Sequence, residues 1–415
     1  MLLAVAAEKD LHMHQIDISN AYLNSDLEED VYLKQPKNYV DKENPGKVLK
    51  LQKAIYGLKQ SERLWNDALN EVLQNMGFKR SKNEACLYYK KQQNGFSYIA
   101  VYVDDLIIIS PKESDIEDIK GSIATKFDMK DGGQLRYFLG MEISRKGQTG
   151  PIKLCQKRYI ENLLRRYGMQ SCRLVGTPFD PGYESGCTNE KCAKVNLTHF
   201  QSLIGSLMYL AVVSRPDILH SVSKLSQRNT DPHHEDEAAA KHVLRYLCGT
   251  INLSIIYMKT GELVKEFADA DWANDKVDRK SYSGYAFLMA GSAFSWGSSK
   301  QSVIAQSSTE AEYIALSTAA KEAVFLRRLL QEMGWFDKGP LKLLCDNLSA
   351  SSIAKNPINH KRTKHIDVRY HFIRDKVNKN EIIVEYVNTQ NNVADILTKA
   401  KALWLFEITW ICLNL

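Results

Sequence analysis

The chain has 415 residues, which at roughly 150 residues per domain predicts about three domains. Of these residues 44% are hydrophobic and 25% charged, a composition that excludes a disordered or fibrous protein. The formal net charge of +6 is compatible with a nucleic-acid partner but does not establish one. We expect no secretory signal, no membrane span and no disulfide framework, because the first residues lack a signal pattern, the apolar stretch 203–214 is short, and the eight cysteines lack paired CxxC spacing.

The first 145 residues are expected to mix helices with short strands. Short apolar runs bounded by turn-forming residues predict strands at 13–18, 31–34, 87–90, 97–103 and 106–110. Apolar side chains recur at helical spacing over 63–76 and stop at Gly77, which predicts an amphipathic helix ended by glycine. A second helix is predicted at 115–126.

The predicted secondary structure of the remaining chain changes near residue 263, from helices alone to strands combined with helices. Helices are predicted at 159–167, 203–213 and 236–247, in a section that we interpret as connecting structure. Strands at 263–268, 284–288, 341–345 and 382–387 then accompany a long helix over 309–333, which predicts a separate α/β domain of the usual size. The predicted boundaries are therefore 1–145, 146–260 and 261–400, with 401–415 as an atypical tail.

Two adjacent carboxylates, Asp104 and Asp105, lie within the apolar run SYIAVYVDDLIIIS. The pair can be read as a plain hairpin turn, since aspartate tolerates turn conformations. It can also be read as a turn that presents carboxylates to Mg²⁺, which takes oxygen ligands and commonly one or two carboxylates. Two-metal phosphoryl transfer needs a further acid from another element, and Asp17 at the end of MHQIDI is the candidate.

Three segments carry a family resemblance: HQIDISNAYLNSDLEEDVYLKQP, AIYGLKQSERLW and YVDDLII, in this order and spacing. They resemble the reverse transcriptase of Ty1/copia-class LTR retrotransposons, and YFLGMEI and AAKHVLRYLCGT are also similar to that family. The resemblance implies an α+β palm-type polymerase domain with truncated fingers over 1–145. It further implies a thumb or connection region over 146–260 and an α/β RNase H-like domain over 261–400.

The resemblance also implies the polymerase site. Asp17, Asp104 and Asp105 would surround two Mg²⁺, with Mn²⁺ as an alternative. Tyr22 takes the place of the aromatic residue that blocks a ribose 2′-OH, although a core aromatic residue would give the same pattern. The segment GLKQS resembles the one that supports the nucleotide and template, and its residues are Gly57, Lys59, Gln60 and Ser61.

Four acids of the last domain form a second set: Asp269 after LVKEFA, Glu312 in the helical run, Asp346 after LKLLC, and Asp395 in NNVADILTKA. Each alone would usually be a solvent-exposed side chain. Together they resemble the D-E-D-D set of the RNase H domain, which implies two further Mg²⁺ that activate water for attack on an RNA phosphodiester.

Two of these positions have an acidic neighbour. Asp271 shares the face of Asp269 if the strand continues, whereas Glu310 points about 200° away from Glu312 on a helix. We choose Asp269 because it directly follows the apolar strand end, and Glu312 because AEYIAL matches the register of the family's catalytic glutamate.

The run NPINHKRTKHIDVRYHFIRDK is rich in cations, and RTKHID within it is similar to the family. Lys364, His365 and Arg369 are therefore predicted to contact nucleic-acid phosphates, with a solvated basic face as the alternative.

The implied function is a retrotransposon reverse transcriptase, an RNA- and DNA-directed DNA polymerase, with ribonuclease H activity on RNA/DNA hybrids. The expected partners are an RNA template, a DNA primer, the hybrid, dNTPs and the remaining Pol or Gag products, with no membrane. The expected location is intracellular, in a cytoplasmic virus-like particle and the nucleus. Two alternatives stay open: a truncated, non-catalytic transposon remnant that at most binds nucleic acid, and a chain that retains RNase H activity only.

Overall fold

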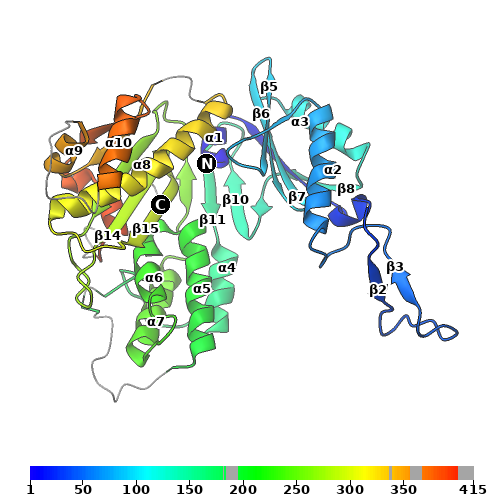
Figure 1. The fold of residues 1–415 in the computed structure, drawn as a ribbon, viewed down its shortest axis with the longest axis horizontal. Coiled ribbons are helices and arrows are strands. Elements are labelled where there is room, and N and C mark those ends of the chain that lie inside the picture. The colour runs from blue at the N-terminus through cyan, green and yellow to red at the C-terminus, as the bar shows by residue number, and fades with distance from the viewer. Residues whose placement is uncertain (181, 184–194, 336–338, 356–366, 401–415) are drawn as a thin grey trace. The chain divides into compact units, whose positions relative to one another are not determined.

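The computed structural model describes residues 1–180, 182–183, 195–335, 339–355 and 367–400 (Figure 1). The chain folds into two compact units. The N-terminal unit comprises residues 11–135 with 332–334, and the C-terminal unit comprises residues 1–10, 136–331 and those from 335 onward. Among the described residues, no helix combines the length and the apolar character that a membrane crossing requires.

The N-terminal unit is built on a six-stranded antiparallel sheet of order β4-β5-β6-β7-β1-β8. Helices α2 (Ser61–Asn75) and α3 (Glu113–Ala124) pack on one face of this sheet through the core residues Trp65, Ile108 and Ile119. A hairpin of β2 (Tyr32–Lys34) and β3 (Val48–Lys50) extends away from the sheet in Figure 1. The strands of the sheet are β1 (His12–Ile18), β4 (Lys79–Arg80), β5 (Leu87–Gln92), β6 (Gly95–Tyr102), β7 (Asp105–Ser110) and β8 (Met129–Gln134).

The turn between β6 and β7 consists of Val103 and Asp104, because Tyr102 pairs with Asp105. Val103 has a φ of 55°, a left-handed conformation that is unfavourable for a β-branched residue. The indole Nε1 of Trp65 donates to the Val103 carbonyl at 2.7 Å, and Ile18 N donates to the Asp104 carbonyl at 2.8 Å. These two bonds hold the strained turn in place.

The C-terminal unit contains a four-stranded antiparallel sheet of order β12-β11-β10-β9 and a group of helices. The N-terminal helix α1 (Leu2–Glu8) belongs to this unit, since the Glu8 carboxylate accepts a hydrogen bond from Thr260 N at 3.0 Å. The strands are β9 (Tyr137–Phe138), β10 (Met141–Arg145), β11 (Ile152–Cys155) and β12 (Ile255–Tyr257). The helices are α4 (Lys157–Arg166), α5 (Leu197–Val213), α6 (Leu219–Ser226) and α7 (His234–Gly249).

A five-stranded mixed sheet of order β15-β14-β13-β16-β17 forms the rest of this unit. Strand β13 is antiparallel to β14 and parallel to β16, which is parallel to β17. The strands are β13 (Lys265–Ala270), β14 (Tyr282–Met289), β15 (Ser292–Lys300), β16 (Leu341–Cys345) and β17 (Ile382–Tyr386). The helices are α8 (Ser308–Glu332), α9 (Leu348–Lys355) and α10 (Asp367–Asn378), with short 3₁₀ turns η4 (Thr389–Asn391) and η5 (Val393–Leu397).

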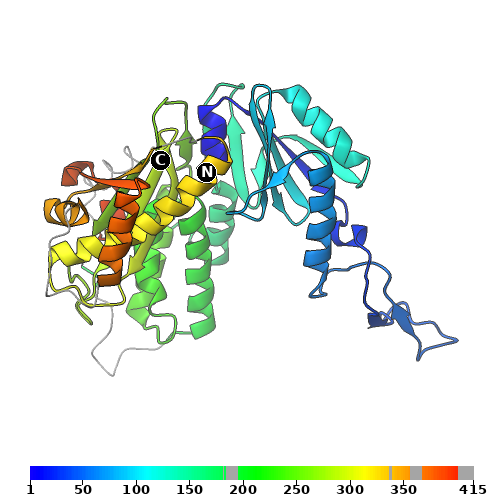
Figure 2. The same ribbon diagram turned by 45° about the horizontal axis from the view of Figure 1, so that its top comes forward.

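The two faces of the five-stranded sheet are covered differently. Helix α8 lies on one face, where Glu322 accepts a hydrogen bond from Ser295 Oγ at 2.8 Å. On the other face, Phe267 and Ala286 join a single hydrophobic core with residues of α4 to α7 such as Phe200, and Figure 2 shows α5, α6 and α7 grouped as one bundle. The predicted connection region and the α/β region therefore share a core, while the boundary at 260/261 stays a prediction.

Candidate active sites

The N-terminal unit brings Asp17, Asp104 and Asp105 together at one end of neighbouring strands. Asp17 on β1 lies directly opposite Asp105 on β7, and Asp104 occupies the preceding turn. The sequence predicts both aspartates in the turn, whereas the structure makes Asp105 the first residue of β7, because the turn consists of Val103 and Asp104. Each strand end thus supplies a carboxylate on a rigid backbone.

Electrostatic repulsion marks this group as a place for a cation. Partial burial, followed by the charges of Asp104 and Asp17, raises the pKa of the Asp105 carboxyl above its ordinary value. Asp17 is exposed, and Asp104 and Asp105 are half-buried, so the group is open to solvent and substrate. Carboxylates from two elements that repel one another fit a hard divalent cation, which takes oxygen ligands.

An aromatic pair lies beside these acids. Tyr22, in the 3₁₀ turn η1 (Ala21–Asn24), packs against Tyr56 with ring centroids 4.3 Å apart. The Tyr56 hydroxyl donates a hydrogen bond to Asp104 Oδ2 at 3.3 Å. Sequence reasoning did not single out Tyr56, although it stands in AIYGLKQ directly before the glycine of the quoted motif. Tyr56 therefore links Tyr22, the predicted ribose-contacting residue, to the turn that carries Asp104.

The predicted nucleotide-supporting segment precedes α2. Gly57 has a φ of +100° and open space where a Cβ would lie, and Lys59 is exposed. Gln60 donates to Glu29 Oε2 at 3.0 Å. Ser61 is buried and donates to the Ile55 carbonyl at 2.6 Å, so its hydroxyl is engaged within the protein.

The C-terminal unit brings together the second set of acids from four elements. Asp269 lies near the end of β13, Asp346 follows β16, Glu312 lies early in α8, and Asp395 lies in η5. Because β13 and β16 are parallel, with Ala268 opposite Cys345, their carboxyl ends reach the same edge of the sheet. This topology explains why residues far apart in sequence meet.

Asp269 is almost completely buried and held by two neighbours. Thr398 Oγ1 donates to its Oδ2 at 2.5 Å, and Asn392 Nδ2 donates to its Oδ1 at 3.2 Å. Burial, with Asp395 as the next cause, raises the pKa of the Asp269 carboxyl to about 7. Asn392 and Thr398 carry no sequence signal of this role beyond their position in the segment around Asp395.

Glu312 supplies the most direct indication of a cation site. Its side chain is 7% exposed, and its Oε2 has no hydrogen-bond partner among the described residues. Ligand atoms of Glu312, Cys345 and Asp346 all lie within 4.8 Å of one another. Burial and the charges of Asp269 and Asp346 raise the pKa of Glu312 to about 9. A buried, unsatisfied carboxylate oxygen among other acids fits a divalent cation.

A lysine partly neutralises this group. Lys399 forms an ion pair with Asp395. Burial opposes the charged ammonium, but the hydrogen bond and charge of Asp395 outweigh it, so the pKa of Lys399 is raised. The negative charges of Asp269 and Asp346 act in the same direction. Lys399 therefore places a positive charge at the acidic group.

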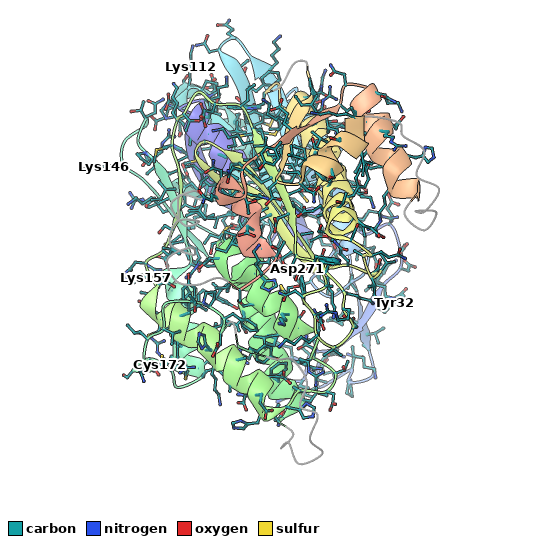
Figure 3. All side chains as sticks on the ribbon, turned by 90° about the vertical axis from the view of Figure 1, so that its left-hand side faces the viewer. Tyr32, Lys112, Lys146, Lys157, Cys172 and Asp271 are labelled. Atoms are coloured by element: carbon teal, nitrogen blue, oxygen red, sulfur yellow. The ribbon has the colours of Figure 1, made fainter. Side chains whose placement is uncertain are left out.

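The two acidic neighbours considered from the sequence have other contacts. Asp271, labelled in Figure 3, accepts a hydrogen bond from Tyr282 N, and burial raises the pKa of its carboxyl to about 6. Glu310 Oε2 accepts a hydrogen bond from Gln306 N at 2.9 Å. Asp395 and Asp346 act on the pKa of Asp269, and Asp269 and Asp346 act on the pKa of Glu312, which places Asp269 and Glu312 within the acidic group.

Of the predicted phosphate-contacting residues, Lys364 and His365 lie outside the described residues. Arg369 is half-buried on α10. Burial lowers the pKa of its guanidinium, and the charge of Glu310 opposes that shift. Its phosphate contact stays a prediction.

Part of the chain matches a known protein family, and a solved structure resembles its fold. Residues 1–181 match the family described as "Reverse transcriptase (RNA-dependent DNA polymerase)". A solved foamy viral protease-reverse transcriptase in complex with double-stranded DNA aligns over 93% of this chain and 59% of its own, with 12% identity and a TM-score of 0.52. That likeness concerns the fold. The fold class predicted from the sequence, an α+β polymerase domain followed by an RNase H-like domain, is confirmed.

The curated relatives define the family more narrowly. The Pol polyprotein from transposon TNT 1-94 of Nicotiana tabacum is 37% identical over 413 residues, which is 98% of this chain and 31% of that protein. A transposon Ty5-1 protein of Saccharomyces cerevisiae is 35% identical over 312 residues, 74% of this chain and its own full length. The chain belongs to the Ty1/copia-type retrotransposon Pol family, and it spans about a third of the TNT 1-94 polyprotein.

Proposed function

We propose that this chain is the reverse transcriptase and ribonuclease H part of a retrotransposon Pol polyprotein, with one phosphoryl-transfer site in each unit. The observation that carries the proposal is the convergence of acids from separate elements at two places. Asp17 and Asp105 face one another on β1 and β7, and Glu312 lies beside Asp346 with a buried oxygen that has no hydrogen-bond partner in the described part of the chain. Membership of the family supports both activities.

At the polymerase site, Asp17, Asp104 and Asp105 would hold two Mg²⁺ or Mn²⁺. The bound cations would activate the primer 3′-OH and stabilise the leaving pyrophosphate. The strained turn at Val103 and its bond from Trp65 keep Asp104 oriented. Tyr22, supported by Tyr56, would face the ribose of the incoming dNTP, with Gly57, Lys59, Gln60 and Ser61 bordering the nucleotide and template.

At the RNase H site, Asp269, Glu312, Asp346 and Asp395 would hold two such ions, which would activate water for attack on the RNA strand of a hybrid. Asn392 and Thr398 orient Asp269, while Lys399 offsets the negative charge at Asp395. The cations of the segment 356–376, with Lys364, His365 and Arg369, would contact hybrid phosphates.

The substrates in this proposal are an RNA template, a DNA primer, dNTPs and the RNA/DNA hybrid. The remaining Pol and Gag products are the proposed protein partners. The proposed place of action is intracellular, in a cytoplasmic virus-like particle and the nucleus.

Two Mg²⁺-dependent assays on the purified chain test the proposal: primer extension on an RNA template and cleavage of an RNA/DNA hybrid. We expect Asp104→Asn to abolish extension and retain cleavage, and Asp346→Asn to do the reverse. Cleavage without extension in the wild-type chain would support the RNase H-only alternative. Absence of both activities in the folded protein would support the non-catalytic remnant and overturn the proposal.

A further inference from the structure

A thiol lies within the acidic group of the C-terminal unit. Cys345 is the last residue of β16, directly before Asp346, and its side chain is completely buried. Its Sγ lies within 4.8 Å of ligand atoms of both Glu312 and Asp346. The backbone register fixes its position, because Cys345 lies opposite Ala268 on one side and Tyr386 on the other.

The acids alone would indicate only a hard cation, but the geometry adds two features. The buried Oε2 of Glu312 lacks a hydrogen-bond partner among the described residues. This oxygen could therefore bind a cation without first losing water or breaking a hydrogen bond within the described part of the chain. The backbone N–H of Asn347 donates to Cys345 Sγ at 3.3 Å. Burial and the charge of Glu312 raise the pKa of the Cys345 thiol, and the bond from Asn347 N–H offsets them only in part. The thiol would therefore lose its proton only when a cation binds the sulfur.

The ligand chemistry selects between cations. Mg²⁺ prefers oxygen ligands, whereas a thiolate favours a softer ion such as Zn²⁺ or Cd²⁺. In a tetrahedral zinc site, bond lengths of about 2.3 Å to sulfur and about 2.1 Å to oxygen place ligand atoms roughly 3.4 to 3.6 Å apart. The observed separations all lie within 4.8 Å, a limit that includes this tetrahedral spacing.

We propose that Glu312, Cys345 and Asp346 form a binding site for a thiophilic divalent cation, with water as the fourth ligand, and that this cation competes with Mg²⁺ for the same carboxylates. Binding replaces the S–H bond of Cys345 with a sulfur–metal bond and releases the proton to solvent. The binding itself is independent of catalysis. The consequence, inhibition of hybrid cleavage by Zn²⁺, rests on the proposed function.

Cobalt(II) absorption tests the binding step on the full chain, because sulfur-to-cobalt charge transfer reports a bound thiolate directly. We expect a near-ultraviolet band that Cys345→Ser abolishes, together with at least a 10-fold loss of Zn²⁺ affinity in calorimetric titration. Cys248→Ser, which removes a half-buried thiol elsewhere in the same unit, is the matched control and should retain the band. A band that persists in Cys345→Ser, or unchanged Zn²⁺ affinity, would overturn the proposal.

Glu312→Gln provides a second variant that keeps the thiol. It should weaken Zn²⁺ binding while retaining the unfolding transition of a folded protein, so a folding defect in Cys345→Ser would not decide the outcome. If the wild-type chain cleaves hybrids, Zn²⁺ should inhibit it at lower concentrations than it inhibits Cys345→Ser. If the chain shows no cleavage, the proposed function fails, but the cobalt band still decides whether the thiophilic site exists.

Discussion

The hydroxyl of Thr398 donates a hydrogen bond to Asp269 Oδ2 at 2.5 Å, and both side chains are buried. Asp269 is fixed on β13, whereas Thr398 directly follows η5, the short turn that carries Asp395. Burial and the charge of Asp395 are the leading causes of the raised pKa of Asp269, and Thr398 lowers it. A single hydroxyl therefore joins two elements of the acidic site and favours the ionised carboxylate.

Thr398→Val removes this hydroxyl at nearly constant shape. We expect the Mg²⁺ affinity of the site and the rate of hybrid cleavage to fall about 10-fold, the lower end of the effect of residues that orient metal ligands. Thr398→Ser retains the donor and should remain close to wild type. Calorimetric Mg²⁺ titration and single-turnover cleavage measure both effects. Equal losses in the two variants would assign Thr398 a packing role instead.

Asn392 offers a test of donor chemistry at the other oxygen of Asp269. Its Nδ2 donates to Asp269 Oδ1 at 3.2 Å, while its Oδ1 accepts from Ala394 N at 3.2 Å. Asn392→Asp keeps the acceptor but replaces the donor with a negative charge beside Asp269. We expect stronger loss of cleavage than in Asn388→Ala, which removes only an exposed cap to Gln390 N. Hybrid cleavage measured as a function of Mg²⁺ concentration compares the two variants. Similar curves for both would contradict the role of Asn392 in positioning Asp269.

Much of the fold follows from sequence periodicity. The helix predicted at 63–76 is observed as α2 at Ser61–Asn75, the strand at 341–345 matches β16, and the helix at 309–333 is α8 at Ser308–Glu332. In each case one face meets a core, so the apolar pattern is strong. Strand β8 is not predicted from the sequence, because its segment MKDGGQ is polar and contains two glycines. It forms through its antiparallel pairing with β1, which no local apolar pattern reveals.

The candidate sites were less predictable from the residues alone. The family motifs predict the acids of both sites. They do not predict Tyr56, Asn392 and Thr398, because these residues contact the acids from other elements of the fold, and no local sequence pattern encodes such contacts. Cys345 shows the same difficulty: as a buried strand residue it looks like ordinary core. Only the parallel pairing of β13 with β16 and the approach of α8 place its thiol beside Glu312.

Tyr56 lies between Tyr22 and Asp104, so it offers a test of ribose selection at the proposed polymerase site. Tyr56→Ala removes both the ring that packs 4.3 Å from Tyr22 and the hydroxyl bonded to Asp104, whereas Tyr56→Phe removes only the hydroxyl. We expect the alanine variant to incorporate ribonucleotides more readily relative to dNTPs, by about 10-fold, if the lost support is worth ~1.4 kcal/mol. The phenylalanine variant should preserve selectivity and lose only rate. Competitive incorporation assays measure this ratio; unchanged selectivity in Tyr56→Ala would refute the link.

Glu312 should make stability fall as pH rises when no divalent cation is present. Its folded pKa of about 9 lies above the ordinary value of 4.5, so between these values the folded state keeps a proton that the unfolded state has lost. Glu312→Gln lacks this effect. Its melting temperature in EDTA should exceed that of wild type by an amount that grows from pH 5 to pH 9, reaching about 2 °C or more if the difference exceeds ~1 kcal/mol.

Thermal unfolding at pH 5, 7 and 9, with and without Mg²⁺, measures this linkage. Added Mg²⁺ should stabilise wild type more than Glu312→Gln, because the cation binds the native carboxylates. A difference between the two proteins that does not change with pH would show that Glu312 does not carry the linkage.

Glu266 is a buried carboxyl outside the candidate site, and its removal should stabilise the protein. Its side chain on β13 is completely buried, and neither carboxylate oxygen has a hydrogen-bond partner among the described residues. Burial raises its pKa well above the ordinary value. Because an unsatisfied buried polar group costs ~1–3 kcal/mol, we expect Glu266→Leu to raise the free energy of unfolding by about that amount.

Two control variants separate the causes of this gain. Glu266→Gln keeps a buried polar group but cannot ionise, so its gain should appear only as pH rises above the ordinary glutamate pKa, where unfolded wild type loses a proton and folded wild type keeps it. Asp217 is equally buried but accepts hydrogen bonds from Arg215 at 2.7 Å and Tyr246 at 2.6 Å. Asp217→Leu should therefore destabilise by about 3–5 kcal/mol, since it strands a buried guanidinium. Denaturant unfolding at pH 5 and pH 8 measures all three, and a destabilised Glu266→Leu would mean that the carboxyl has a partner in solution.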